Sequence, residues 1–123
     1  MPELPKVLYV DDEEINLELL QLTFRNDLKV YTAITEEEGF MILSKNQDIR
    51  VVISDLKMPN MGGLELLEHI RSRHESVLTV ITTGYGTVET AIEAMKGGAY
   101  DFLRKPLSLS EVKLLIDRAV GAE

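Results

Sequence analysis

Residues 51–55, with the sequence VVISD, and residues 7–12, with the sequence VLYVDD, are short apolar runs that end in carboxylates. Both runs are rich in β-branched or aromatic residues, which favour β-strands. Their nearly continuous apolar character is typical of strands that are covered on both faces, as in a parallel sheet. These stretches therefore predict buried strands whose carboxyl ends carry acidic side chains.

Strand-like and helix-like segments alternate along the rest of the chain. Strands are predicted over residues 7–10, 28–32, 51–53, 77–82 and 100–103. Helical spacing between and after them is carried by Ile15, Leu19 and Leu22, by Leu66, Leu67 and Ile70, and by Val112, Ile116 and Ala119. Because strands and helices alternate, we expect an α/β fold with a doubly wound parallel sheet. The expected sheet has five strands in the flavodoxin-like order 2-1-3-4-5, flanked by five helices.

The helix expected before the last strand has an amphipathic pattern. Its apolar residues follow the period i, i+3, i+4, i+7 and are predicted to form one buried stripe: Val88, Ala91, Ile92 and Met95. Gly97-Gly98 is expected to end this helix with left-handed backbone. Thr35 followed by Glu38 has the spacing of a capping box, which indicates the start of an earlier helix.

Length and composition limit the classes of protein to consider. A chain of 123 residues, 45% of them hydrophobic, suits one compact domain over residues 1–123. The absence of cysteine excludes disulfides, thiolate zinc sites and cysteine nucleophiles, and it fits a cytoplasmic location. The net charge of −8 argues against direct nucleic-acid binding. No apolar run is long enough to span a membrane, and the amino terminus lacks the layout of a signal peptide.

Polar residues follow the strands at one predicted edge of the sheet. In a sheet of this order, ligands bind outside the carboxyl ends of the strands, where the first and third strands meet. The residues expected there are Asp11, Asp12, Asp55, Thr83 and Lys105. Neighbouring strands lie about 4.8 Å apart, so the three carboxylates are expected to converge on a small volume.

Three converging carboxylates favour a cation site. Like charges repel and raise one another's pKa unless a cation neutralises them, and Mg²⁺ prefers oxygen ligands. The alternative is that Asp11 and Asp12 only cap the first helix. The acidic pair at the end of one strand, together with Asp55 at the end of the neighbouring strand, favours a metal site over helix capping alone. With Mg²⁺ in place, Asp55 is a candidate nucleophile toward phosphorus, and Lys105 and Thr83 are positioned to stabilise developing charge.

These residues, taken in order, resemble the receiver domains of bacterial response regulators over nearly the whole chain. The resemblance includes Met58-Pro59 and Gly62-Gly63 after the third strand. It implies that Asp55 is the phosphoacceptor and that Mg²⁺ is held by Asp11, Asp12, Asp55 and the backbone carbonyl of Lys57. It also implies that Thr83 and Phe102 are the switch residues and that the Lys105-Pro106 peptide bond is cis. It also implies the CheY-like form of the predicted fold.

The resemblance further implies a phosphorylation-dependent signalling switch of a two-component system. The phosphoryl group would come from a sensor histidine kinase, a phosphotransfer protein or a small phosphodonor. Its arrival would change the surface of the fourth helix, fifth strand and fifth helix, which is also a candidate homodimer face. The domain would phosphorylate and dephosphorylate itself without being a turnover enzyme. Gly84 stands where alanine is more common, and together with Lys57 and Tyr85 it is expected to tune the phosphoryl lifetime.

Two other functions remain to be weighed. A flavodoxin-like cofactor module shares the predicted fold, although carboxylates after the first strand would repel a phosphate. A pseudo-receiver would bind a partner without phosphorylation, although the set of site residues is complete here. A phosphatase of the haloacid dehalogenase type is excluded, because it needs an aspartate where this chain has Lys57.

Overall fold

The chain folds into one parallel sheet with the predicted strand order. The computed structural model describes residues 4–55, 63–73, 76–84, 88–105 and 107–121. The five strands lie in the order β2-β1-β3-β4-β5. They are β1 (Lys6–Val10), β2 (Lys29–Ala33), β3 (Val51–Asp55), β4 (Leu78–Thr83) and β5 (Asp101–Arg104). The predicted fold class is therefore confirmed, and every strand lies within two residues of its predicted bounds.

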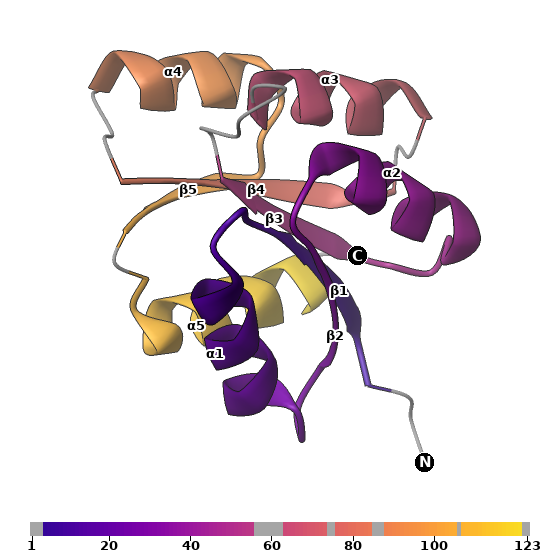
Figure 1. Ribbon diagram of the computed structural model, residues 1–123. Coiled ribbons are helices and arrows are strands. Elements are labelled where there is room, and N and C mark those ends of the chain that lie inside the picture. Colours follow the sequence, from indigo (N-terminus) through magenta and orange to yellow (C-terminus); the bar gives the residue numbers. More distant parts are fainter. Residues whose placement is uncertain (1–3, 56–62, 74–75, 85–87, 106, 122–123) are drawn as a thin grey trace.

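Five helices cover both faces of this sheet (Figure 1). They are α1 (Glu14–Phe24), α2 (Glu36–Lys45), α3 (Gly63–Arg73), α4 (Val88–Lys96) and α5 (Leu109–Gly121). Helices α1 and α5 lie on one face, and α2, α3 and α4 lie on the other. Strand β3 is buried along its whole length, as its apolar sequence predicted.

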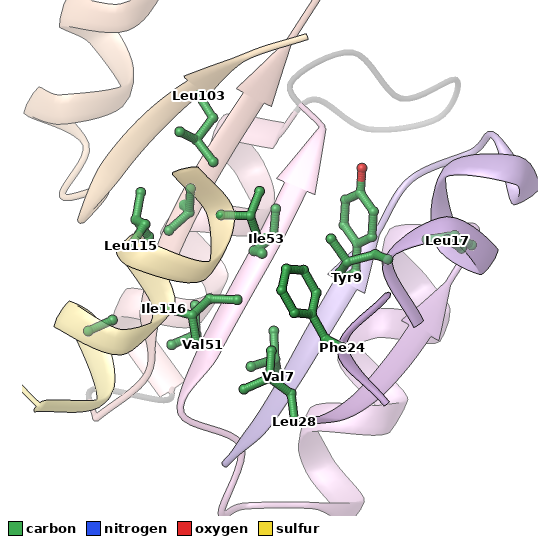
Figure 2. Packing of buried hydrophobic residues seen from close by; sticks show 14 residues of the cluster. Val7, Tyr9, Leu17, Phe24, Leu28, Val51, Ile53, Leu103, Leu115 and Ile116 are labelled. Atoms are coloured by element: carbon green, nitrogen blue, oxygen red, sulfur yellow. The ribbon is translucent and has the colours of Figure 1, made fainter. Parts of the chain in front are cut away.

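The largest apolar cluster lies between the sheet and helices α1 and α5 (Figure 2). Tyr9 of β1, Phe24 of α1 and Ile116 of α5 all belong to it. A second cluster packs under α2 and α3, and a third joins α3, α4 and the last two strands. The site at the carboxyl edge therefore rests on strands that are fixed from both sides. Among the described residues, no helix combines the length and apolar character needed to cross a membrane.

Local sequence signals account for two of the helix ends. The Thr35 hydroxyl accepts the backbone N–H of Glu38 at 3.1 Å and caps α2. The Glu38 carboxylate accepts the backbone N–H of Ile34 at 3.3 Å, one residue before the expected partner of a capping box. Gly98 has φ of 101°, which confirms the left-handed turn predicted after α4.

The predicted buried stripe of α4 is wrong in part. Ile92 and Met95 are nearly half exposed, whereas Ala94 is buried. Ala94 packs with Leu67, Ile81 and Ala99, so α4 contacts the sheet through this small side chain. The side chains of Val88 and Ala91 lie outside the described part of the chain.

Helix α1 is also turned away from the face that its apolar spacing suggested. The residues that predicted the helix, Ile15, Leu19 and Leu22, are all exposed. A second apolar set faces the sheet instead: Leu17, Leu20 and Phe24. The helix is present as predicted, but it is apolar on two sides, and periodicity alone did not identify the buried one.

Candidate functional site

Three carboxylates meet at the carboxyl edge of β1 and β3. Val10 of β1 pairs with Ser54 of β3, which brings the following residues, Asp11 and Asp55, side by side. One ligand oxygen each from Asp11, Asp12 and Asp55 lies within 4.8 Å of the others. Asp11 and Asp55 are buried and Asp12 is exposed, so the cluster has a buried base and an open side. The convergence predicted from sequence is therefore present.

The Lys105 ammonium lies between two of these carboxylates. Its Nζ donates to Asp55 Oδ2 at 2.8 Å and to Asp11 Oδ2 at 2.9 Å. The backbone N–H of Lys105 donates to the Thr83 carbonyl at 2.8 Å, which fixes the base of the side chain against β4. Burial alone would lower the pKa of Lys105, but hydrogen bonds and charges from Asp55 and Asp11 outweigh it and raise that pKa. The lysine is therefore held in its charged form.

Asp11 accepts hydrogen bonds from several groups besides Lys105. Its Oδ2 also accepts from the Tyr9 hydroxyl at 3.1 Å and from Asn16 Nδ2 at 3.3 Å. Its Oδ1 accepts the backbone N–H of Glu13 at 2.9 Å. Burying a carboxylate is costly unless its oxygens accept hydrogen bonds such as these. Asp11 is therefore fixed by both the strand before it and the helix after it.

Sequence reasoning did not identify Tyr9 and Asn16 as site residues. Tyr9 lies on β1, two positions before Asp11, and this spacing places both side chains on the same face of the sheet. Burial, followed by the charge and hydrogen bond of Asp11, raises the pKa of the Tyr9 hydroxyl far above its ordinary value of 10.0. The hydroxyl therefore remains protonated and acts as a donor to Asp11.

The two predicted switch residues lie on the neighbouring strands β4 and β5, on the same face of the sheet. Thr83 is buried at the end of β4, next to the strand that carries Asp55. Phe102 pairs in register with Ile81 on β5, is half-buried and packs against the cluster beneath α3 and α4. The structure therefore connects the site edge, through β4 and β5, with the helix face predicted to change.

The remaining predicted residues are only partly described. Gly84 is exposed, and a Cβ added there would meet no other heavy atom within 4 Å. An alanine would therefore fit, and space does not require the glycine. Lys57, Tyr85 and Pro106 lie outside the described residues, so the Lys57 carbonyl ligand, the cis Lys105-Pro106 bond and the roles of Lys57 and Tyr85 in tuning stay predictions.

The donor set suits a hard divalent cation. All three converging side chains offer carboxylate oxygens, which are the ligands that Mg²⁺ and Ca²⁺ prefer. The cluster is open on the side of exposed Asp12, so a cation could keep several of its waters there. Asp11, Asp12 and Asp55 together can therefore hold a metal ion.

Known proteins with similar sequences and structures share this arrangement of elements. The family model for the response regulator receiver domain matches residues 7–117. The response regulator protein PilR of Pseudomonas aeruginosa is 35% identical over 116 residues, which cover 94% of this chain and 26% of PilR. A response regulator receiver domain from Clostridium thermocellum has a TM-score of 0.91 and 35% identity, with 97% of this chain and 96% of that chain covered.

A third similar structure is the beryllofluoride-activated NtrC4 receiver domain dimer. It has a TM-score of 0.85 and 32% identity, with 95% of this chain and 97% of that chain covered. The chain spans about a quarter of the length of PilR and of the regulatory protein AtoC of Escherichia coli. The match over residues 7–117 and the shared fold lead to one assignment: the chain belongs to the response regulator receiver domain family of two-component signal transduction.

Proposed function

We propose that the chain is a switch that accepts one phosphoryl group on Asp55, with Mg²⁺ held by Asp11, Asp12, Asp55 and the Lys57 carbonyl. The observation that carries this proposal is the placement of Asp55. Its Oδ2 lies 2.8 Å from the Lys105 ammonium. Its carboxylate also lies within the group of converging oxygens that suits a divalent cation. A nucleophile, a fixed positive charge and a candidate metal site therefore meet at one edge.

The proposed reaction transfers a phosphoryl group from a donor to the carboxylate. An Asp55 oxygen forms a bond to phosphorus while the bond from phosphorus to a donor nitrogen or oxygen breaks, and the donor atom keeps that electron pair. Mg²⁺, when bound, supplies charge that neutralises the phosphoryl oxygens. Lys105 turns from the two carboxylates toward the new phosphoryl oxygens, and the Thr83 hydroxyl donates a hydrogen bond to them.

The switch follows from the added charge. A phosphoryl group brings a charge of about −1.5 to −2 to an edge whose carboxylates already repel one another. Thr83 moves inward with its hydrogen bond, and Phe102 turns into the space that Thr83 leaves. The resulting change reaches the α4-β5-α5 surface as a shift between two packed states. Hydrolysis of the acyl phosphate at the same site resets the switch. The domain thus phosphorylates and dephosphorylates itself as a signal, and turnover of a substrate is not its role.

Partners are proposed from the same geometry. The donor is a sensor histidine kinase, a phosphotransfer protein or a small phosphodonor, and the absence of cysteine fits an encounter in the cytoplasm. The α4-β5-α5 surface carries exposed Ile92 and Met95 on α4 and exposed Leu114 on α5. These apolar residues support a homodimer through that surface, as does the similarity to a receiver that is described as an activated dimer.

Acetyl phosphate tests the acceptor residue directly. The wild-type chain, incubated with acetyl phosphate and Mg²⁺, is expected to gain the mass of one phosphoryl group, and Asp55→Asn is expected to gain none. Asp117→Asn is the matched control, because Asp117 undergoes the same change on the exposed face of α5, where it pairs with Lys113. A phosphorylated Asp55→Asn variant would show that the acceptor lies elsewhere.

Sedimentation with beryllofluoride tests the switch and the partner together. Beryllofluoride with Mg²⁺ imitates the phosphoryl group, so it is expected to drive the wild-type chain toward a dimer and to leave Asp55→Asn unchanged. A wild-type chain that gains no mass from acetyl phosphate and does not bind beryllofluoride would be a pseudo-receiver. In that case the proposed function would be abandoned.

A further inference from the structure

The Tyr9 hydroxyl is a polar group in an otherwise apolar cluster. Tyr9 is fully buried between β1 and the helices α1 and α5, and its ring packs with Leu17, Leu20 and Phe24. Figure 2 shows the hydroxyl directed toward the carboxyl ends of the strands. The hydroxyl meets Asp11 there, so the core and the candidate site are joined through this side chain.

The two oxygens of Asp11 carry different numbers of donors. Oδ2 accepts from Lys105, Tyr9 and Asn16, whereas Oδ1 accepts from the backbone of Glu13. A carboxylate oxygen has about two lone-pair sites, so three donors crowd Oδ2. One donor can leave and Oδ2 still accepts hydrogen bonds, provided that the other two donors stay.

Lys105 is the donor best able to leave. Its ammonium sits on a long flexible stem and already has a second partner in Asp55. The Tyr9 ring, in contrast, is locked in the core, and Asn16 is fixed on α1. A departing Lys105 would leave a buried carboxylate with one donor fewer, which is costly unless fixed donors keep that oxygen hydrogen-bonded.

We propose that Tyr9 is a positioning residue whose hydroxyl holds the Asp11 carboxylate when Lys105 leaves it for the phosphoryl group. This inference rests on the proposed function, because it assumes that movement of Lys105. Tyr9 stays out of contact with the reacting atoms and acts through Asp11. It keeps one metal-holding carboxylate oriented while the charge beside it changes.

Tyr9→Phe removes the hydroxyl and keeps the ring that fills the core. Calorimetry without any phosphodonor is expected to show that the variant binds Mg²⁺ about tenfold more weakly. Losing a hydrogen-bond partner of a metal-binding side chain typically weakens metal affinity on this scale. At saturating Mg²⁺, its rate of phosphorylation by acetyl phosphate is expected to return to the wild-type value. Tyr31→Phe is the matched control, because Tyr31 is a half-buried tyrosine of β2 outside the site.

Proton NMR of the wild-type chain provides a test that needs no variant. The buried Tyr9 hydroxyl proton is expected to exchange slowly. It is also expected to move downfield when Mg²⁺ and beryllofluoride draw Lys105 away, because its bond to Asp11 strengthens. A hydroxyl resonance that does not move would overturn the inference, as would a Tyr9→Phe variant with wild-type Mg²⁺ affinity. If the wild-type chain itself binds no Mg²⁺, the proposed metal site fails as well, which is a different outcome.

Discussion

The two ends of the parallel sheet carry charged side chains in opposite settings. At the carboxyl end, the side chains of Asp11, Asp55 and Lys105 are 0%, 10% and 17% exposed, and one ammonium joins them. At the amino end, Lys6 pairs with Asp48, and their side chains are 21% and 57% exposed. Both ends pair carboxylate with ammonium, but the carboxylates are buried at the carboxyl end and the paired carboxylate is exposed at the amino end.

The difference in burial predicts a difference in coupling. Water and salt screen an exposed pair, so removing one partner changes little. A buried group of charges depends on its own members for compensation, so removing one of them affects the rest. The carboxyl end can therefore convert a local change of charge into a change of structure, and the amino end is a natural control for it.

Removing the ammonium at the carboxyl end is expected to have the largest effect on stability. Lys105→Met keeps most of the stem and leaves Asp11 and Asp55 without their shared cation. We expect the free energy of unfolding without metal to fall by about 2 to 3 kcal/mol, below the full cost for a buried pair because the edge is partly open. Urea unfolding measures it, and Lys6→Met is the control, with an expected change of about 1 kcal/mol or less.

The pH dependence of the Lys105 contribution has a definite sign. The folded-state pKa is raised above the ordinary value of 10.5, so the contribution is present below that value and is lost as pH rises through the folded pKa. The difference between the wild-type chain and Lys105→Met should hold through the neutral range and shrink only at strongly alkaline pH. Equal losses for Lys105→Met and Lys6→Met would remove the distinction between the two ends.

A smaller effect of opposite sign is expected at Asp12. Its carboxylate oxygen lies within 4.8 Å of those of Asp11 and Asp55, so the three repel one another without a cation. Asp12→Asn is expected to stabilise the metal-free chain by about 1 kcal/mol, the scale of one like-charge contact in a water-rich setting. Thermal unfolding at rising Mg²⁺ concentration should then reverse the order, because the wild-type chain binds the cation more tightly. A variant less stable than wild type without Mg²⁺ would contradict this account.

The sequence predicted the strands and the converging carboxylates well because both depend on short-range patterns. A buried parallel strand is a continuous apolar run, and the residue after it must lie at the carboxyl edge. The sequence alone therefore places Asp11, Asp55 and Lys105 together. The alternation of strands and helices then predicted a parallel sheet, for which the flavodoxin-like strand order was expected.

Helix faces and hydrogen-bond directions were not accessible in the same way. On α1, Leu19 and Leu20 are equally apolar, and only packing against the sheet decides which one is buried. On α4, Ala94 is a weak signal in an apolar pattern, yet it is buried in the cluster between the helix and the sheet. The sequence indicated only a strand residue at Tyr9. Its hydrogen bond to Asp11 depends on where the hydroxyl points after the ring has packed, which the sequence does not show.

The smallest effect is expected at the amino end, where Asp48→Asn removes the carboxylate that pairs with Lys6. The hydrogen bond from Lys6 lowers the pKa of Asp48 below its ordinary value of 3.8. A carboxylate of this kind adds stability above its unfolded pKa, and that stability is lost as pH falls through the folded pKa. The variant should therefore unfold at the wild-type temperature at neutral pH in moderate salt, with a small deficit appearing only at low ionic strength. Acidification should erase that deficit, because the wild-type carboxyl becomes protonated. A deficit that persisted in high salt would mean that the Lys6–Asp48 pair is as strongly coupled to the fold as the carboxyl edge, and exposure would then fail to explain why the two ends differ.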